Sequence, residues 1–169
     1  AQSAEKSGKD SIDLDTWDHV IDLNLRSAFL FCRACVPAMR DAGFGRIINL
    51  SSRSAQGETG PITTVAGRLP YATAKAALVG LTRQLAKDVA EFGITVNALA
   101  PGLILGEQGT RIRDRFDQLD PSARESMLRV YPMNRAGTGD EVAAMIEFLV
   151  SDAAGYISGT LIPIDGAAS

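Results

Sequence analysis

Helix-like and strand-like segments alternate three times along this chain of 169 residues. The helical segments show apolar residues at spacings of three and four, and the strands are short apolar runs bounded by glycine or proline. The expected helices cover residues 15–42, 71–92 and 140–150, and the expected strands cover residues 46–51, 94–100 and 160–164. Strands separated by helices are normally parallel and joined by right-handed crossovers. The alternation therefore predicts an α/β fold with a doubly wound, Rossmann-like parallel sheet of about three strands.

The ends of these elements are marked by capping residues and by residues that break regular structure. Asp15 is the expected N-cap of the first helix, and Gly43 and Gly93 end the first two helices. Pro163 lies inside the last strand, which predicts a place at the edge of the sheet, because a missing N–H is tolerated there.

Length and composition indicate one globular domain over residues 1–169, with residues 1–14 as a loop and residues 103–138 as an irregular region that holds the substrate loop. The net charge of −3 argues against a partner with a phosphate backbone. No apolar run approaches the ~20 residues that span a bilayer, and the polar residues 1–10 do not resemble a secretory signal. We expect a cytoplasmic protein that binds neither nucleic acid nor membranes.

Histidine and cysteine are scarce, which narrows the chemistry. The single histidine, His19, argues against a Ser-His-Asp triad or a zinc site built from histidines. Cys32 and Cys35 form a Cys-x-x-Cys pattern, but it lies in an apolar helical segment and has no second cysteine pair. Such cysteines are usually small buried hydrophobes, so no metal site is expected.

The strongest local pattern is Tyr71-Ala-Thr-Ala-Lys75. Residues four apart share one face of a helix, so the lysine ammonium lies near the phenol. A nearby positive charge favours phenolate and lowers a pKa that is ~10 without neighbours, which suits a general acid or base. Such a pair also arises by chance on many helices.

Serines at the end of the preceding strand support a functional role for Tyr71 and Lys75. Asn49-Leu50-Ser51-Ser52 ends the first expected strand, and the ends of strands are where open α/β sheets place their sites. A serine hydroxyl there can donate to a substrate carbonyl and stabilise developing negative charge.

Several longer motifs occur in the order found in one known family. They are Trp17-Asp18-x-x-Ile21-Asp22-x-Asn24-Leu25-x-Ser27-x-Phe29, Gly45-Arg46-Ile47-Ile48-Asn49-Leu50-Ser51-Ser52, Tyr71-x-x-x-Lys75-Ala76-Ala77-Leu78, Gly93-Ile94-Thr95-Val96-Asn97-Ala98-Leu99-Ala100-Pro101-Gly102, Pro132-Met133-x-Arg135-x-Gly137 and Ile164-Asp165-Gly166. Together they cover about residues 13–166 and resemble the second, catalytic half of the short-chain dehydrogenases/reductases.

The resemblance implies four catalytic roles. Tyr71 would give or take a proton at the substrate oxygen, Ser52 would orient that oxygen, and Lys75 would hold the nicotinamide ribose and lower the pKa of the tyrosine. Asn24 would bind a water that links Lys75 to solvent; its plainer interpretation is a polar helix residue with a local partner. The residues implied to contact NAD or NADP are Asn24, Tyr71, Lys75, Pro101, Gly102 and Ile104.

Two local features depart from the family pattern. Ser52 and Tyr71 are 19 positions apart, more than the family leads one to expect, so the loop around residues 56–68 is expected to line or cover the substrate pocket. This spacing leaves Ser51 and Ser54 as less favoured candidates for the serine role. Gly106 stands near the place where a threonine often contacts the cofactor.

The largest departure concerns the cofactor-binding half. The family begins with a βαβαβ unit whose glycine-rich turn lies under the cofactor pyrophosphate, and no such pattern precedes Asn24. The chain is either part of a longer enzyme or a truncated product, and the reading frame upstream of Ala1 would distinguish them. The corresponding functions are an NAD(P)-dependent oxidoreductase, acting on a 3-oxoacyl thioester, a sugar or a small alcohol, and a non-catalytic remnant that serves as an assembly or binding module.

A partner of the same chain is also expected. The middle of the first helix, residues 28–39, is apolar nearly all round, so one side can cover the sheet while the other needs a partner. The resemblance likewise implies a homodimer or homotetramer that pairs helices 16–42 and 71–92.

Overall fold

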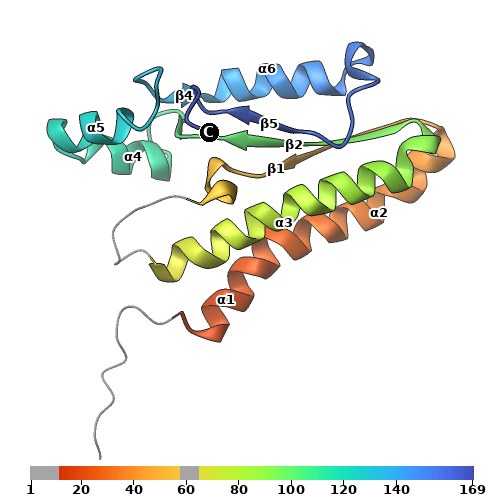
Figure 1. Cartoon of the computed structure of the whole chain (residues 1–169), viewed down its shortest axis with the longest axis horizontal. Coiled ribbons are helices and arrows are strands. Elements are labelled where there is room, and N and C mark those ends of the chain that lie inside the picture. The colour runs from red at the N-terminus through yellow and green to blue at the C-terminus, as the bar shows by residue number, and fades with distance from the viewer. Residues whose placement is uncertain (1–11, 58–64) are drawn as a thin grey trace, which may run out of the picture.

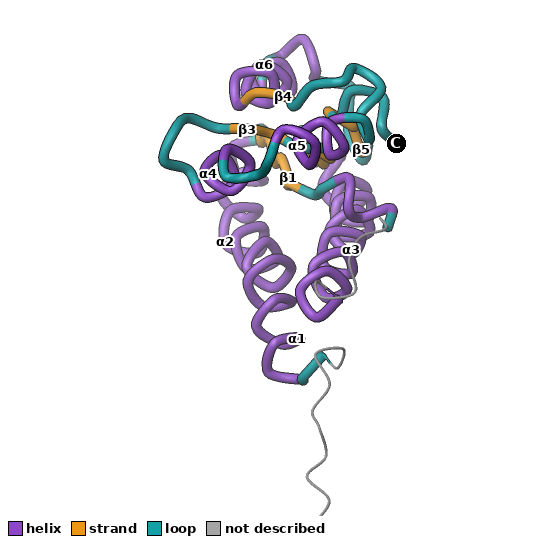
Figure 2. Tube along the Cα trace, turned by 90° about the vertical axis from the view of Figure 1, so that its left-hand side faces the viewer, coloured by secondary structure: helices purple, strands orange, loops and turns teal. Residues whose placement is uncertain are grey.

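The computed structural model describes residues 12–57 and 65–169, in which a sheet lies between two layers of helices (Figure 1). The helices are α1 (Leu14–Ile21), α2 (Ser27–Ala42), α3 (Val65–Val89), α4 (Arg111–Asp117), α5 (Pro121–Leu128) and α6 (Gly139–Val150). The strands are β1 (Gly45–Leu50), β2 (Ile94–Pro101), β3 (Ile104–Leu105), β4 (Gly137–Thr138) and β5 (Leu161–Ile164). Figure 2 shows α2 and α3 on one side of the sheet and α6 on the other.

The central sheet is parallel throughout, with the strand order β1-β2-β5. Leu50 of β1 is paired with Leu99 of β2, and Ala100 of β2 is paired with Pro163 of β5. Pro163 thus lies on an edge strand of the described sheet, as predicted. The α/β class and the three parallel strands are confirmed.

The first helix differs from its prediction in two ways. Its N-cap is Asp13, whose carboxylate accepts a hydrogen bond of 2.7 Å from the Thr16 N–H, so the prediction of Asp15 is wrong. Both aspartates are good caps, and Asp15 instead lies in the first turn, where a negative charge also suits the helix dipole. A π-helical turn, Asp22–Arg26, separates α1 from α2, so the expected continuous helix is interrupted.

Helix α3, which carries Tyr71 and Lys75, begins at Val65 rather than at residue 71. Pro70 is the sixth residue of α3, so the second turn of the helix lacks one backbone hydrogen bond. A 3₁₀ turn, Arg53–Gln56, also occupies part of the segment between β1 and α3. Residues 58–64, which include most of the proposed extra loop, lie outside the described residues.

The region 103–138 contains more regular structure than a loop. It holds helices α4 and α5, and β3 and β4 form an unexpected parallel pair with Ile104 opposite Gly137. A Cβ atom on Gly137 would lie 2.7 Å from Ile104 Cδ1, so any side chain there would require the end of the Ile104 side chain to move. Strands of two residues are too short for a periodic pattern to reveal them.

Two apolar clusters hold the layers together. On the α2 and α3 side, Ala86 and Val89 pack with Ile94 and Val96 of β2. On the α6 side, Leu149 packs against Leu99 and is fully buried, a contact that contributes about 1.5–3 kcal/mol. In the part of the chain that the structure describes, no helix is long and apolar enough to cross a membrane.

Candidate active site

A cavity of about 480 Å³ opens where β1 and β2 end. It brings together six of the seven residues singled out from the sequence, namely Ser52, Tyr71, Lys75, Pro101, Gly102 and Ile104. They come from the end of β1, from α3 and from the turn after β2. This is the edge at which open parallel sheets place their ligands.

Tyr71 and Lys75 lie one turn apart on α3, as their spacing requires. The Lys75 Nζ atom is 5.4 Å from the centre of the Tyr71 ring, and it donates a hydrogen bond of 2.8 Å to the carbonyl oxygen of Leu50. Burial lowers the pKa of Lys75 below its usual value, because the ammonium loses part of its hydration. The cavity therefore holds a partly desolvated cation beside a phenol.

Ser52 stands at the end of β1 with a hydroxyl that has donor capacity left. Its Oγ atom accepts a hydrogen bond of 3.1 Å from the Ser54 N–H, which leaves the hydroxyl hydrogen for another acceptor. Ser51 uses its own hydroxyl to donate to the Lys75 carbonyl oxygen at 2.7 Å, and Ser54 is buried. Among the three serines, the arrangement favours Ser52 as the group that meets a substrate oxygen.

Asn24 lies apart from the other predicted residues. It lines a neighbouring cavity of about 450 Å³, which shares Leu50 and Lys75 with the first cavity. Its Nδ2 atom donates to the Val20 carbonyl oxygen at 3.0 Å, within the region of the π-helical turn. Asn24 thus has the local hydrogen-bond partner that a purely structural role would give it. Lys75 lines both cavities and so lies between Asn24 and the other predicted residues.

The turn after β2 is held by contacts that the sequence did not reveal. The Gly102 N–H donates to the Ile164 carbonyl oxygen at 3.0 Å. A Cβ atom on Gly102 would lie 2.7 Å from Tyr131 Cε1 and 3.0 Å from Asp165 Cβ, so a side chain cannot be added without displacing these neighbours. Tyr131 and Asp165 are distant in sequence, and no local pattern links them to this turn.

Part of the cavity wall also escaped prediction. Ile112 of α4 and the side chains of three α6 residues, Val142, Ala143 and Ile146, line it, and so does Gly139 at the start of α6. These side chains are apolar, so the cavity combines a polar side at the strand ends with an apolar wall. Their place depends on how α6 packs on the sheet, which the spacing of residues does not specify.

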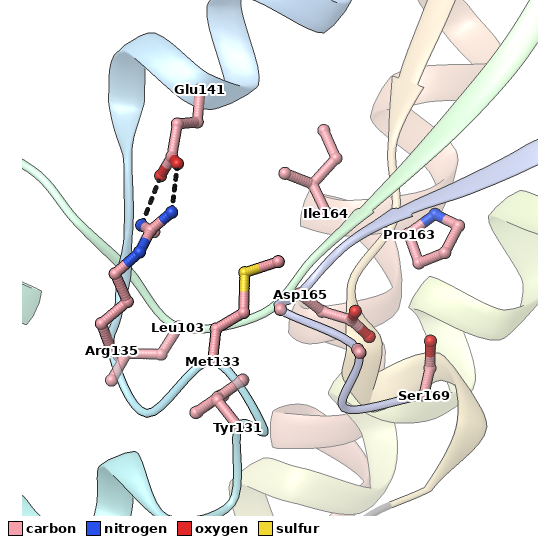
Figure 3. Close-up of a pocket in the computed structure, with 12 residues that line it drawn as sticks. Leu103, Tyr131, Met133, Arg135, Glu141, Pro163, Ile164, Asp165 and Ser169 are labelled. Carbon is pink, nitrogen blue, oxygen red and sulfur yellow. Dashed lines mark hydrogen bonds and ion pairs between the residues drawn. The ribbon is translucent and has the colours of Figure 1, made fainter.

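A further cavity, of about 440 Å³, lies beside the C-terminal segment (Figure 3). Met133 and Ile164 line it together with an ion pair, in which Arg135 donates to the two carboxylate oxygens of Glu141 at 2.6 and 2.9 Å. None of the predicted catalytic residues lines this cavity. Elsewhere in the described residues, Cys32 is buried and Cys35 is exposed, both as free thiols, and no group of three or more side chains could hold a metal ion.

Comparison with known proteins relates this chain to a group of reductases. A family model described as enoyl-(acyl carrier protein) reductase matches residues 2–168. The chain is 37% identical over 157 residues to levodione reductase from Leifsonia aquatica, which covers 90% of this chain and 55% of that protein. It is 39% identical over 152 residues to 3-oxoacyl-[acyl-carrier-protein] reductase from Pseudomonas aeruginosa, with 90% and 56% covered.

Solved structures agree with the sequence relatives. A Beutenbergia cavernae protein assigned as an NAD(P)-dependent gluconate 5-dehydrogenase, with NADP bound at low occupancy, matches with a TM-score of 0.79 and 33% identity. The match covers 94% of this chain and 59% of that one. The chain thus spans about half the length of the curated relatives that it matches. The chain belongs to the short-chain dehydrogenase/reductase family of oxidoreductases and corresponds to part of the length of its members.

Proposed function

We propose that the chain supplies the catalytic groups of an NAD(P)-dependent oxidoreductase that interconverts a carbonyl and an alcohol. The observation that carries the proposal is the cavity at the strand ends, where Ser52, Tyr71 and Lys75 lie together. The same set gives no support to a non-catalytic remnant, because such a module would not need a partly desolvated lysine beside a tyrosine. The cytoplasmic location expected from the sequence stays a prediction.

The residues of this cavity fit the nicotinamide end of the cofactor. Lys75 has three N–H donors, and the structure records one of them on Leu50, so others can bind ribose hydroxyls. The Pro101-Gly102 turn and Ile104 line the same cavity and would lie against the nicotinamide ring. When bound, the reduced cofactor supplies a hydride to the carbonyl carbon.

The protein's own groups would manage the substrate oxygen and its proton. Ser52 donates a hydrogen bond to the carbonyl oxygen and stabilises the negative charge that develops there. Tyr71 gives that oxygen a proton during reduction and removes it during oxidation. Lys75 places positive charge beside the phenol, and a water bound near Asn24 would return the proton from solvent through the second cavity.

For the substrate we propose a chemical class and no single compound. The apolar wall formed by Ile112, Val142 and Ile146 suits a carbonyl compound with an apolar body. Two relatives are named for levodione and for 3-oxoacyl-[acyl-carrier-protein], and both names describe reductases. A 3-oxoacyl thioester, a small alcohol and a sugar remain the substrates to test.

Replacing Tyr71 with phenylalanine tests the proposal directly. The substitution Tyr71→Phe removes one hydroxyl and keeps the ring, so kcat should fall about 10²–10⁴-fold while the fold is retained. Steady-state kinetics with NADH and NADPH, in the natural polypeptide that contains this chain, measures the loss, and thermal unfolding checks the fold. Tyr156→Phe is the matched control, because Tyr156 is fully exposed and does not line the cavity. A kcat of Tyr71→Phe within twofold of wild type would refute the assignment.

A further inference from the structure

We propose that Asn49 and Thr82 are positioning residues for this reaction. Their buried hydrogen bond would fix where α3 lies along β1, and so set the Tyr71 hydroxyl relative to Ser52. The inference rests on the proposed function. The two residues are far apart in the sequence, and neither lines the cavity at the strand ends. Asn49 lines the neighbouring cavity that Asn24 also borders.

The bond is a polar contact inside an apolar layer. The Asn49 Nδ2 atom donates to Thr82 Oγ1 at 2.9 Å, and the two residues are 7% and 0% exposed. Thr82 is the one polar residue among the buried residues described on α3; the others are Pro70, Ala74, Leu78, Ala86 and Val89. A buried polar pair of this kind favours one packing arrangement over its alternatives.

Burial of apolar area alone does not define the position of α3 along the strand. The hydrophobic effect itself has no direction, so burial of apolar area does not select one position of α3 along β1; the interdigitated side chains and the polar contacts select it. An N–H···O hydrogen bond, in contrast, tolerates only about 2.7–3.2 Å between its heavy atoms. The bond between Asn49 and Thr82 therefore helps to set this position together with the surrounding leucine and alanine side chains.

The two residues are well placed to pass this position on to the active site. Asn49 lies three residues before Ser52 on one continuous backbone segment. Thr82 lies seven residues after Lys75, which is almost two helical turns, so the two residues share a face of α3 about 10 Å apart. Because α3 is one helix, a shift at Thr82 moves Tyr71 and Lys75 together.

A second pair of contacts joins β1 and α3 nearer the active site. Ser51 donates to the Lys75 carbonyl oxygen, and Lys75 Nζ donates to the Leu50 carbonyl oxygen. The Lys75 side chain would turn toward the ribose when the cofactor binds, and its contact with Leu50 would then weaken. The bond from Ser51 to the Lys75 backbone and the bond between Asn49 and Thr82 do not involve the lysine ammonium. The two bonds together would set both the position and the direction of α3 along β1.

Thr82→Val and Thr82→Ser separate the hydroxyl from the bulk of the side chain. Valine keeps the shape and removes the hydroxyl, so we expect kcat to fall about tenfold or more, since a displacement of 1 Å can cost about 10² in rate. Serine keeps the hydroxyl, so kcat should stay within about threefold of wild type. The midpoint of the pH profile of kcat should not move in either variant, because Tyr71 and Lys75 keep their mutual geometry.

The matched control is Thr95→Val. Thr95 is a buried threonine of β2 whose hydroxyl has no recorded hydrogen-bond partner, so the same substitution there should leave kcat unchanged. The double variant Asn49→Leu/Thr82→Val removes both polar groups, so its melting temperature should exceed that of Thr82→Val. Its kcat should nevertheless remain low, because the directional contact is still missing.

Each outcome of this series decides a separate point. Full kcat in Thr82→Val, equal losses in Thr82→Ser or Thr95→Val, or recovery of kcat in the double variant would overturn the positioning role. The Tyr71→Phe variant measured in parallel reports on the proposed function by itself. A crystal structure of Thr82→Val gives a readout besides activity, since an unchanged distance between Ser52 Oγ and Tyr71 Oη would also overturn the inference.

Discussion

Glu141 is the carboxylate with the most distinct environment in the described residues. Arg135 binds both of its oxygens, and the Thr138 N–H donates to Oε2 at 2.9 Å. These hydrogen bonds, that of Arg135 first, lower the pKa of Glu141 from its ordinary 4.5 to about 2. A lowered pKa in the folded state means that the ionised form contributes stability above pH 4.5, and that this contribution is lost as the pH falls toward 2.

Comparing wild type with Glu141→Gln measures that contribution. We expect wild type to be the more stable protein at pH 7 and the difference in free energy of unfolding to shrink at pH 3. Urea denaturation at the two pH values gives the difference, and added salt should reduce it, because the pair is exposed. Glu147→Gln, which changes an exposed carboxylate of the same helix, should show no such trend. An equal difference at both pH values would contradict the prediction.

A single residue could be assigned to the site from the sequence only where its neighbours in the chain indicate its position. Tyr71 and Lys75 could be paired from sequence because a spacing of four fixes a shared helix face, and Ser52 could be placed because strand ends lie at one edge of the sheet. Thr82 and Tyr131 could not be linked to the site in this way. Their partners, Asn49 and Gly102, lie far away in the sequence and meet them only when the layers pack.

At the scale of elements, α2 exposes large apolar side chains in more than one direction, since Phe29 and Phe31 line different cavities. Phe29, Leu30 and Phe31 are 48%, 48% and 72% exposed, and a groove of about 350 Å³ runs between α2 and α3. Phe29 and Leu85 line this groove from the two helices. The expectation of a homodimer or homotetramer paired through these helices stays a prediction, and exposed apolar surface of this kind supports it.

The oligomer prediction can be tested with one charge. Phe29→Glu places a carboxylate in the groove, so we expect the natural polypeptide to change from a dimer or tetramer to a smaller species in light scattering. Leu14→Glu is the matched control, because Leu14 is 77% exposed on α1 and does not line the groove. A wild-type protein that is monomeric at micromolar concentration would contradict the prediction.

The sequence predicted the type and order of the main helices and strands correctly, but it predicted the residues at which they begin and end less well. Periodic spacing identified the three principal helices and three strands, because each buries one side for several turns or residues. It did not identify the π-helical turn, Asp22–Arg26, since one additional residue in a turn hardly changes an apolar pattern. The start of α3 at Val65 was missed for another reason, because the residues before Tyr71 resemble a loop in composition.

At the scale of the whole molecule, residues 1–169 contain only part of the cofactor site that the family uses. The pyrophosphate of a dinucleotide is normally held by backbone N–H groups at the start of the first helix of the fold, after a glycine-rich turn. No such glycine pattern precedes Asn24 in the sequence, and the residues of the cavity at the strand ends are proposed to contact the nicotinamide end. The open edge of β1 is where the preceding part of the family's sheet would pair.

We therefore expect residues 1–169 alone to bind NADH and NADPH weakly. Calorimetric titration of this polypeptide with each cofactor should give no measurable binding at micromolar concentrations. A polypeptide that adds the glycine-rich unit should bind at least one of the two. A dissociation constant in the low micromolar range for the 169 residues would show that the main cofactor contacts lie elsewhere in the chain.

The parallel register of the sheet also has a consequence for how the molecule folds. Leu50 and Leu99 are neighbours in the sheet but are separated in the chain by the whole of α3, and the residues that pair β2 with β5 are separated by α4, α5 and α6. Neither pairing can start as a hairpin, so each strand must wait for a long loop to close, which is slow. Single helices form within about a microsecond. Folding should therefore pass through a stage in which α2 and α3 exist beside unpaired strands, and during synthesis this stage is when the chain is most prone to aggregate.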